Sequence, residues 1–114
     1  MTLRLSPRQG SAVALASLAL AGCGGGDSPP APPQSATVDI REFKYAPQTV
    51  RVAAGGAVTF VNRDRASHTA TAEQAFDTGR LKRGQRRPVR FAETGRLSYL
   101  CTFHPYMKAA VEVE

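Results

Sequence analysis

The sequence predicts an all-β domain built as an antiparallel sandwich or barrel. Short segments in which apolar residues alternate with mostly polar neighbours recur from residue 38 onward, and a period of two is that of a half-buried strand. Glycine-containing turn sequences separate these segments. No stretch carries an apolar stripe at helical spacing over three turns. Many short strands with turns between them favour a sandwich or a barrel.

Six segments carry the strand pattern. In chain order their apolar residues are Val38 and Ile40, Val50 and Val52, Val58 and Phe60, Val89 and Phe91, Leu97 with Tyr99 and Cys101, and Val111 with Val113. Turns are expected at residues 53–56, at Gly84 and at residues 93–95, and only residues 66–76 could wind briefly into a helix. Because a short turn separates residues 89–91 from 97–101, these two segments are predicted to pair as an antiparallel hairpin.

Residues 1–22 are interpreted as a secretory signal. A basic start precedes the apolar run SAVALASLALA at residues 11–21, which is shorter than the roughly 20 residues that cross a bilayer. The run ends in Leu20-Ala21-Gly22-Cys23, which resembles a bacterial lipobox. The resemblance implies cleavage before Cys23 and lipid on that residue. We therefore expect a periplasmic or cell-envelope protein anchored to a bacterial membrane; the alternative is an ordinary signal with a chance cysteine.

The remaining chain divides into a tether and one domain. Residues 23–35 comprise the expected lipidated cysteine and a Gly/Pro-rich segment, whose composition favours a flexible or extended linker. Residues 36–114 are the predicted folded domain. A chain of 114 residues allows one ordinary domain, and two cysteines are too few for a disulfide scaffold or a zinc ribbon. Fifteen Lys and Arg against nine Asp and Glu give a net charge of +6.

Four scarce residues define the candidate site. Cys101, His104 and Met107 are spaced by three residues in CTFHPYM, and His68 lies 33 residues before Cys101. A thiolate, two imidazoles and a thioether form the ligand set of a trigonal copper site with a weak axial methionine. A tight loop with this spacing could direct three side chains toward one ion, with His68 supplied by a second loop. Singly, a buried Cys or Met is more often core packing, but the convergence of all four favours copper.

The sequence resembles the cupredoxins, and among them the amicyanin/plastocyanin group. The matching segments are VTFVNRD at residues 58–64 leading to His68, FDTG at 76–79, and YLCTFHPYM at 99–107. The resemblance implies a Greek-key β-sandwich with one type 1 copper per chain and one-electron transfer outside the cytoplasm. It also implies that His68, Cys101 and His104 are equatorial ligands and that Met107 is the axial ligand. The domain is short for the family, which suggests a trimmed N-terminal strand.

Three residues are expected to surround the ligands, namely Thr69, Thr102 and Asn62. The position after the first ligand is often Asn in this family, where it ties the two copper loops together, but here it is Thr69. The Thr69 hydroxyl could reach Thr102, and the Thr69 N–H could bond the thiolate. Hydrogen bonds of this kind tune metal sites.

Two surface features are candidates for partner docking. In the family the second histidine is the electron port, and Phe103, Pro105 and Tyr106 would suit a docking patch around His104, with simple loop packing as the alternative. The basic residues expected at the copper end are Lys82, Arg83, Arg86 and Arg87. They would steer an acidic redox partner, or else form a solvated turn. The resemblance suggests a c-type cytochrome or a periplasmic dehydrogenase as the redox partner. We expect the protein to be a monomer and to bind no nucleic acid.

Two other functions compete with electron transfer. A copper store or chaperone would bind the same metal without shuttling electrons, although such proteins favour open sites rich in Met or Cys. A thiol enzyme would use Cys101 and His104, but it needs a substrate cleft and has no task for Met107. A copper oxidase or nitrite-type reductase needs a second, histidine-rich centre, which the two histidines of this chain do not provide. We therefore expect a protein that is not an enzyme.

Overall fold

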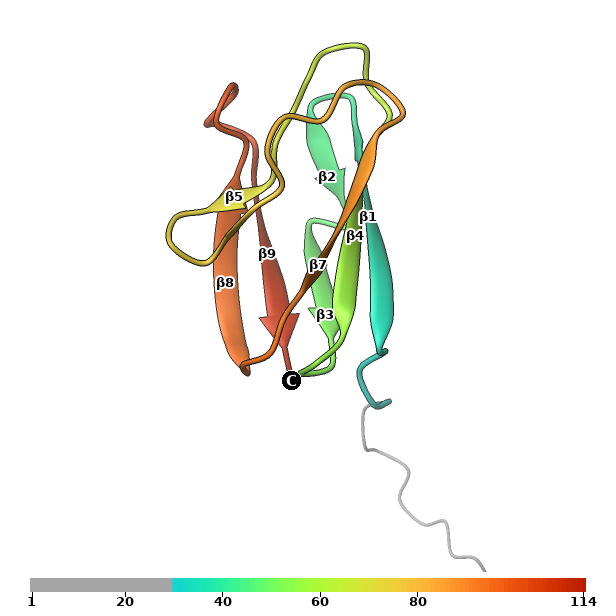
Figure 1. Cartoon of the computed structure of the whole chain (residues 1–114), viewed down its shortest axis with the longest axis vertical. Helices are drawn as coiled ribbons and strands as arrows, with labels where there is room; N and C mark the ends of the chain where they lie inside the picture. The colour runs from blue at the N-terminus through green and yellow to red at the C-terminus, as the bar shows by residue number, and fades with distance from the viewer. Residues whose placement is uncertain (1–29) are drawn as a thin grey trace, which may run out of the picture.

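Two β-sheets face each other in the computed structural model, which describes residues 30–114 (Figure 1). The strands of this part are β1 (Ser35–Arg41), β2 (Lys44–Ala46), β3 (Thr49–Val52), β4 (Ala57–Asn62), β5 (Thr71–Ala72), β6 (Phe76–Asp77), β7 (Arg86–Arg90), β8 (Gly95–Leu100) and β9 (Lys108–Val113). The predicted signal, Cys23 and most of the tether lie outside the described residues. Within residues 30–114 no helix is long and apolar enough to cross a membrane.

The all-β sandwich predicted from the alternating pattern is confirmed. One sheet has the order β2-β1-β4-β7, and the other has the order β3-β9-β8-β5-β6. The sheets are mixed rather than purely antiparallel, because β1 runs parallel to β4 and β3 runs parallel to β9. β1 and β3, which come early in the chain, therefore pair with β4 and β9, which come later. Both sheets thus depend on contacts between segments that are distant in the sequence.

The predicted hairpin between residues 89–91 and 97–101 is wrong. β7 pairs with β4 in one sheet, whereas β8 pairs with β9 and with β5 in the other. The segment between β7 and β8 crosses from sheet to sheet, and the Phe91 N–H extends the pairing with β4 by donating to Gly56 O at 2.9 Å. Apolar alternation reports that a strand is half-buried but does not say which sheet it joins.

Residues 66–76 contain no helix. Instead β5 and β6 form a short antiparallel hairpin in which Thr71 lies opposite Asp77. A second hairpin, which the sequence pattern did not reveal, joins β1 and β2 through Glu42 and Phe43, whose φ angles are +53° and +58°. Positive φ at both central residues is the mark of a type I′ turn, which normally takes Asn-Gly. A left-handed conformation costs about 1–2 kcal/mol for each non-glycine residue.

The core fills the space between the two sheets. Val38, Ile40 and Phe60 contribute from the four-stranded sheet, and Tyr99 and Val111 from the five-stranded sheet; all are buried. Burying an aliphatic or Phe side chain stabilises the fold by about 1.5–3 kcal/mol. The ring of Tyr99 lies 5.4 Å from that of Phe60. Burial raises the pKa of the Tyr99 hydroxyl, so this ring stays uncharged in the core.

Four connections gather at one end of the sandwich, opposite the end that carries the C-terminus (Figure 1). They are residues 42–43, 63–70, 78–85 and 101–107. The alternating strands thus bring all four candidate ligand residues to this end, because His68 lies in the second connection and Cys101, His104 and Met107 lie in the fourth.

Candidate metal centre

The loop that follows β8 is closed by its own main chain. The Cys101 N–H donates to Met107 O at 3.2 Å, the His104 N–H to Cys101 O at 3.2 Å, and the Met107 N–H to His104 O at 2.8 Å. These bonds join residues that are three or six positions apart. They close the loop into a compact turn that holds Cys101, His104 and Met107 close together. Cys101 and Met107 are buried, whereas His104 is partly exposed. The loop thus surrounds a buried thiol and thioether and leaves one imidazole at the surface.

His68 is fixed by a different loop. Its backbone exchanges hydrogen bonds with Leu81, at 3.1 Å and 2.8 Å, and its side chain is fully buried. The buried Asn62 restrains the loop that leads to His68, because its side-chain amide donates hydrogen bonds to Ala66 O and to Leu81 O, each at 2.8 Å. Asn62 therefore holds the His68 loop through main-chain carbonyls, and no hydrogen bond from it to a candidate ligand side chain occurs in residues 30–114.

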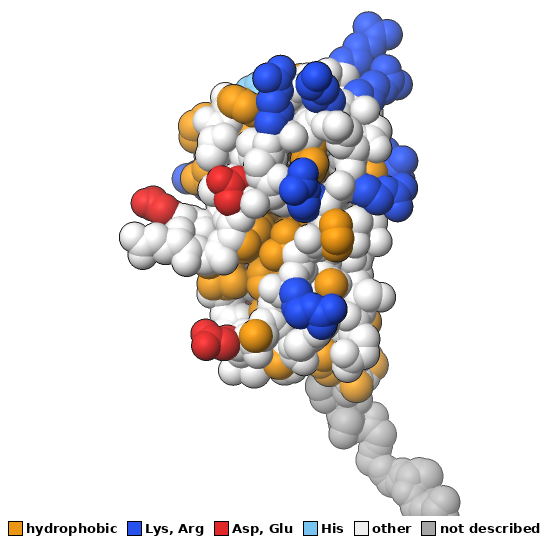
Figure 2. Space-filling view, in the orientation of Figure 1, with side chains coloured by type: hydrophobic (Ala, Val, Ile, Leu, Met, Phe, Trp, Pro, Cys, Tyr) orange, Lys and Arg blue, Asp and Glu red, His pale blue; other side chains and the backbone are white. Residues whose placement is uncertain are grey.

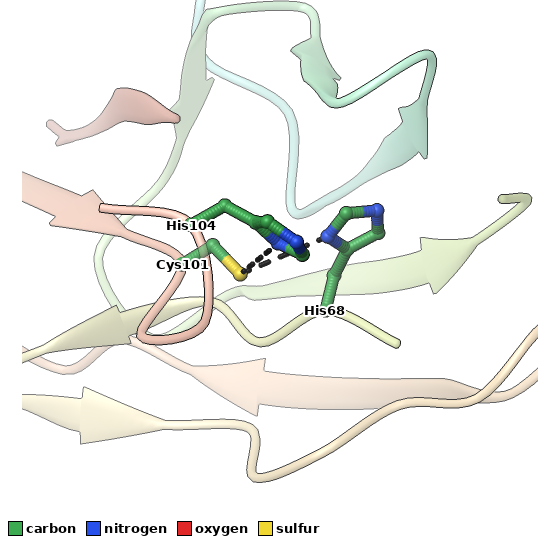
Figure 3. Close-up of side chains that lie close together, drawn as sticks. All are labelled: His68, Cys101 and His104. Carbon is green, nitrogen blue, oxygen red and sulfur yellow. Dashed lines mark hydrogen bonds between the residues drawn. The ribbon is translucent and has the colours of Figure 1, made fainter. Parts of the chain in front are cut away.

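The three strongest donor atoms converge on one point (Figure 3). Cys101 Sγ lies 3.7 Å from His68 Nδ1 and 3.6 Å from His104 Nδ1, and the three atoms lie within 4.8 Å of one another. Metal bonds of about 2.0 Å to nitrogen and about 2.3 Å to sulfur, meeting at 120°, would separate nitrogen from sulfur by about 3.7 Å. The donor set therefore fits a metal ion with three ligands near one plane.

Thr69 ties the two loops together, which the sequence left open because the family often has Asn at this position. Its N–H donates to Cys101 Sγ at 3.4 Å, and its hydroxyl oxygen accepts the Thr102 N–H at 3.0 Å. The two threonine hydroxyls lie 3.3 Å apart. The buried Tyr45 hydroxyl adds a third restraint by donating to Thr69 O at 2.5 Å. Hydrogen bonds of this kind around a ligand tune a metal site, and these bonds fix where the Cys101 sulfur lies.

Sequence reasoning missed two residues beside the imidazoles. The Asp64 carboxylate contacts His68 Nε2 at 2.8 Å, on the side of the ring away from Cys101. The Phe43 ring stands edge-on to both histidines, with centroid distances of 5.1 Å to His68 and 5.0 Å to His104. Asp64 had a weak signal, its position four residues before His68. Phe43 had none, because nothing in the sequence places the β1–β2 turn over the site.

The predicted docking residues surround the exposed edge of His104. Phe103 is 50% exposed and Tyr106 is 69% exposed, and their rings lie 6.5 Å and 6.0 Å from that of His104. Pro105 is exposed between them. Large apolar side chains at such exposure are available for contact with another molecule.

The four predicted basic residues lie at the same end of the molecule. Lys82 and Arg83 follow Leu81, the backbone partner of His68, and Arg86 stands opposite Val61 at the end of β4. Lys and Arg side chains gather at this end in Figure 2. All four are exposed, and none pairs with an acidic side chain among the described residues; the four are Lys82, Arg83, Arg86 and Arg87. The pairing that brings them there is β7 with β4, not the predicted β7–β8 hairpin.

Comparison with known proteins supports a copper site. Residues 33–114 match the copper-binding proteins of the plastocyanin/azurin family. Amicyanin-alpha of Methylorubrum extorquens is 34% identical over 90 residues, which cover 74% of this chain and 76% of the relative. A mutant amicyanin solved in its Cu(I) form superposes with a TM-score of 0.66 at 31% identity, covering 71% of this chain and 83% of the other. The copper-containing nitrite reductase of Thermus scotoductus gives 0.65 at 27% identity, covering 82% of this chain but 25% of the enzyme.

Proposed function

Because the chain belongs to the plastocyanin/azurin family of copper-binding proteins, we propose that it is an electron carrier whose type 1 copper is held by His68, Cys101, His104 and Met107. The copper supplies one-electron chemistry by cycling between Cu(II) and Cu(I). The convergence of a buried thiol and two ring nitrogens at about 3.6–3.7 Å carries the proposal.

The protein's contribution is to keep the donors in place when the charge of the site changes. The Thr69 N–H holds Cys101 Sγ, and the Thr102 N–H holds the Thr69 side chain. The main-chain bonds within residues 101–107 restrain His104 and Met107 in the same way. A packed site that moves little costs little reorganisation when an electron arrives or leaves, which is what a carrier needs.

His104 is the proposed port for the electron. Its ring contributes Nδ1 to the buried cluster and is itself partly exposed, whereas His68 and Cys101 are fully buried. The surrounding Phe103 and Tyr106 offer an apolar surface on which a partner could exclude water. The exposed basic residues at the same end would attract an acidic redox protein, such as a c-type cytochrome or a periplasmic dehydrogenase. We also propose that the protein works as a monomer and that it does not bind nucleic acid.

The proposed location rests on the N-terminal sequence. The lipobox-like Leu20-Ala21-Gly22-Cys23 supports export and anchoring of Cys23 in a bacterial membrane, with the copper domain in the periplasm or cell envelope.

The competing functions account for less of the site. Cys101 is fully buried, whereas a catalytic nucleophile must reach its substrate. Both histidines of the chain stand in the one cluster, so none remains for the second centre of a copper reductase or oxidase. A store or chaperone remains the alternative, and slow copper exchange with fast electron self-exchange would exclude it.

Addition of Cu(II) to the purified protein tests the proposal. We expect one copper per chain and an intense blue colour from charge transfer between the Cys101 thiolate and copper. Cys101→Ser should abolish the colour, while the matched control Cys23→Ser should keep it. A colourless one-to-one complex of the unmodified protein, or a blue Cys101→Ser variant, would contradict the proposed centre.

A further inference from the structure

The carboxylate of Asp64 binds three hydrogen-bond donors from two separate parts of the chain. Oδ1 accepts the Glu42 N–H at 2.6 Å and Oδ2 accepts the Phe43 N–H at 2.9 Å, while Oδ2 also lies 2.8 Å from His68 Nε2. The Asp64 side chain is 14% exposed. Its own N–H donates to Asn62 Oδ1 at 2.9 Å, which fixes where the carboxylate stands. One largely buried charge thus joins the β1–β2 turn to a candidate copper ligand.

The first consequence concerns which nitrogen of His68 carries the proton. A carboxylate accepts hydrogen bonds, so His68 donates from Nε2 and its Nδ1 is left with a free lone pair. Nδ1 is the atom that faces Cys101 Sγ, at 3.7 Å. A carboxylate behind a ligating histidine fixes the tautomer and raises the basicity of the ring. The hydrogen bond to Asp64 therefore leaves the lone pair of His68 Nδ1 free to bind the metal.

The second consequence concerns the turn that carries Phe43. Glu42 and Phe43 both have positive φ, a conformation that non-glycine residues rarely adopt. In this conformation their two successive N–H groups point to one side and form a pocket for an anion, which the Asp64 carboxylate occupies. The carboxylate thus stabilises a turn that the sequence alone disfavours.

The position of the turn decides what covers the histidines. The Phe43 ring is nearly perpendicular to both imidazoles, at 89° to His68 and 88° to His104, and the two imidazole centroids are 5.0 Å apart. Phe43 therefore lies across the gap between the two rings and limits the access of water to it. If the turn moved, this cover would move with it.

From these contacts we propose that Asp64 is a positioning residue of the copper centre, which sets the tautomer of His68 and latches Phe43 over both imidazoles. The inference rests on the proposed copper site, since it concerns how that site is prepared. Its effect on the metal is electrostatic as well as geometric. A negative charge beside a ligand favours Cu(II) over Cu(I), so removing the charge of Asp64 should raise the reduction potential.

Two measurements on the copper-free protein test the inference without relying on the metal. Nitrogen-15 NMR of the unmodified protein should show His68 protonated at Nε2 and not at Nδ1. In Asp64→Asn the Glu42 and Phe43 amides should exchange with solvent about tenfold faster or more, because their charged acceptor is gone. Asp39→Asn is the matched control, since Asp39 lies on neighbouring β1 and pairs with Arg41 and Arg63 rather than with His68.

The copper-loaded protein supplies the third readout. Asp64→Asn should bind copper about 10–100-fold more weakly and should have a higher reduction potential, whereas Asp39→Asn should match the unmodified protein in both. A His68 ring protonated at Nδ1, or Asp64→Asn and Asp39→Asn variants with equal exchange rates and potentials, would overturn the inference. Failure of the blue colour would count against the copper site, while the NMR and exchange results would still decide the role of Asp64.

Discussion

The two ends of the sandwich are closed by different parts of the chain. At the end that carries the C-terminus, main-chain hydrogen bonds join neighbouring loops and strands. They include Ala53 N–H to Pro33 O at 2.8 Å, Gly55 N–H to Phe91 O at 2.6 Å, Ala57 N–H to Gln34 O at 3.0 Å and Ala54 N–H to Glu114 O at 3.2 Å. At the copper end, main-chain bonds also join loops, as between His68 and Leu81, but the side chains of Asn62, Asp64 and Thr69 make further connections between them. The loops of one end are therefore joined mainly by the backbone, whereas those of the copper end depend on side chains as well.

This difference separates stability from function. Main-chain bonds form with almost any side chain. The stability of the end that carries the C-terminus, called the far end below, should therefore be sensitive to substitution mainly where an added side chain would collide with the backbone. Side-chain bonds depend on the residue type, so substitutions at the copper end should change the metal site while leaving the sandwich folded. Variants at the two ends should consequently fail in different assays.

Gly56→Ala should give the largest loss of stability. A Cβ at this buried position would collide with the carbonyl oxygen of Gln34 and would stand 3.0 Å from that of Ala53. Both obstacles are backbone and cannot rotate away, so the free energy of unfolding of the copper-free protein should fall by about 1–3 kcal/mol or more. Chemical denaturation measures this fall, and the blue colour of the folded, copper-loaded variant should be unchanged.

Gly84→Ala is the matched control at the copper end. Gly84 also lies in a turn, but a Cβ there meets nothing within 4 Å, and only its φ of +84° opposes the substitution. The expected cost is about 1–2 kcal/mol of backbone strain without a collision. If Gly56→Ala unfolded no more easily than Gly84→Ala, or altered the colour, the far end would not be the independent closure described above.

Charge distinguishes the two ends as well. Near the far end, Arg51 pairs with Glu114 and Arg96 pairs with Glu112. At the copper end, four exposed basic residues have no acidic partner in residues 30–114, namely Lys82, Arg83, Arg86 and Arg87. Reversing Arg83, Arg86 and Arg87 to Glu should slow electron transfer with an acidic partner by about 10-fold or more at low salt, because steering raises association rates by about 10–10³. Colour and potential should be nearly unchanged.

Stopped-flow kinetics over a range of salt concentrations would measure this effect. The rate for the unmodified protein should fall steeply with added salt, and that for the triple variant should not. Arg90→Glu with Arg96→Glu, two reversals away from the copper loops, serves as the control and should lose less per charge. Equal salt dependence of the triple variant and the unmodified protein would show that the basic residues are only a solvated turn.

The contrast between the two ends also explains what the sequence could predict. The strands around Val38, Val58, Tyr99 and Val111 follow directly from apolar alternation, because each strand buries one face. The candidate ligands were recognisable because the chain has only two histidines, and one lies between a cysteine and a methionine at steps of three. The link from Thr69 to Cys101 and Thr102 was only a possibility in the sequence, because the family often has Asn at this position, and the structure shows that it forms.

What the sequence did not predict depends on contacts between distant segments. β7 and β8 have the pattern of a hairpin, yet they join different sheets, because their partners β4 and β9 are set by the whole fold. The turn at Glu42 and Phe43 carries no glycine or asparagine, so it lacked the usual signal. It forms where Asp64, more than 20 positions later, supplies the acceptor. The same distance hid the approach of Phe43 to both histidines.

The smallest expected effect concerns the ion pair between Arg51 and Glu114, which reinforces the main-chain closure of the far end. Arg51 binds Glu114 through two nitrogens, Nε to Oε2 and Nη2 to Oε1, each at 2.8 Å. The hydrogen bond from Arg51 lowers the pKa of the Glu114 carboxyl, and the same contact raises that of the Arg51 guanidinium. Both groups are near the surface, where solvent screens them, so the contribution at neutral pH should be small.

The direction of the pH dependence follows from the lowered pKa of Glu114. The unfolded chain binds a proton at this group near pH 4.3, and the folded protein does so only at lower pH. The stabilisation is therefore complete above that value and is lost as the pH falls through the folded pKa.

Glu114→Gln should flatten the decline in unfolding free energy between pH 7 and pH 3, as measured by denaturation of the copper-free protein. Glu93→Gln is the control, because Glu93 makes no ion pair among residues 30–114 and its removal should leave the decline unchanged. Since all other acidic groups are shared, their titration cancels in the comparison. A decline as steep in Glu114→Gln as in the unmodified protein would show that the ion pair between Arg51 and Glu114 adds nothing to the main-chain closure of the far end.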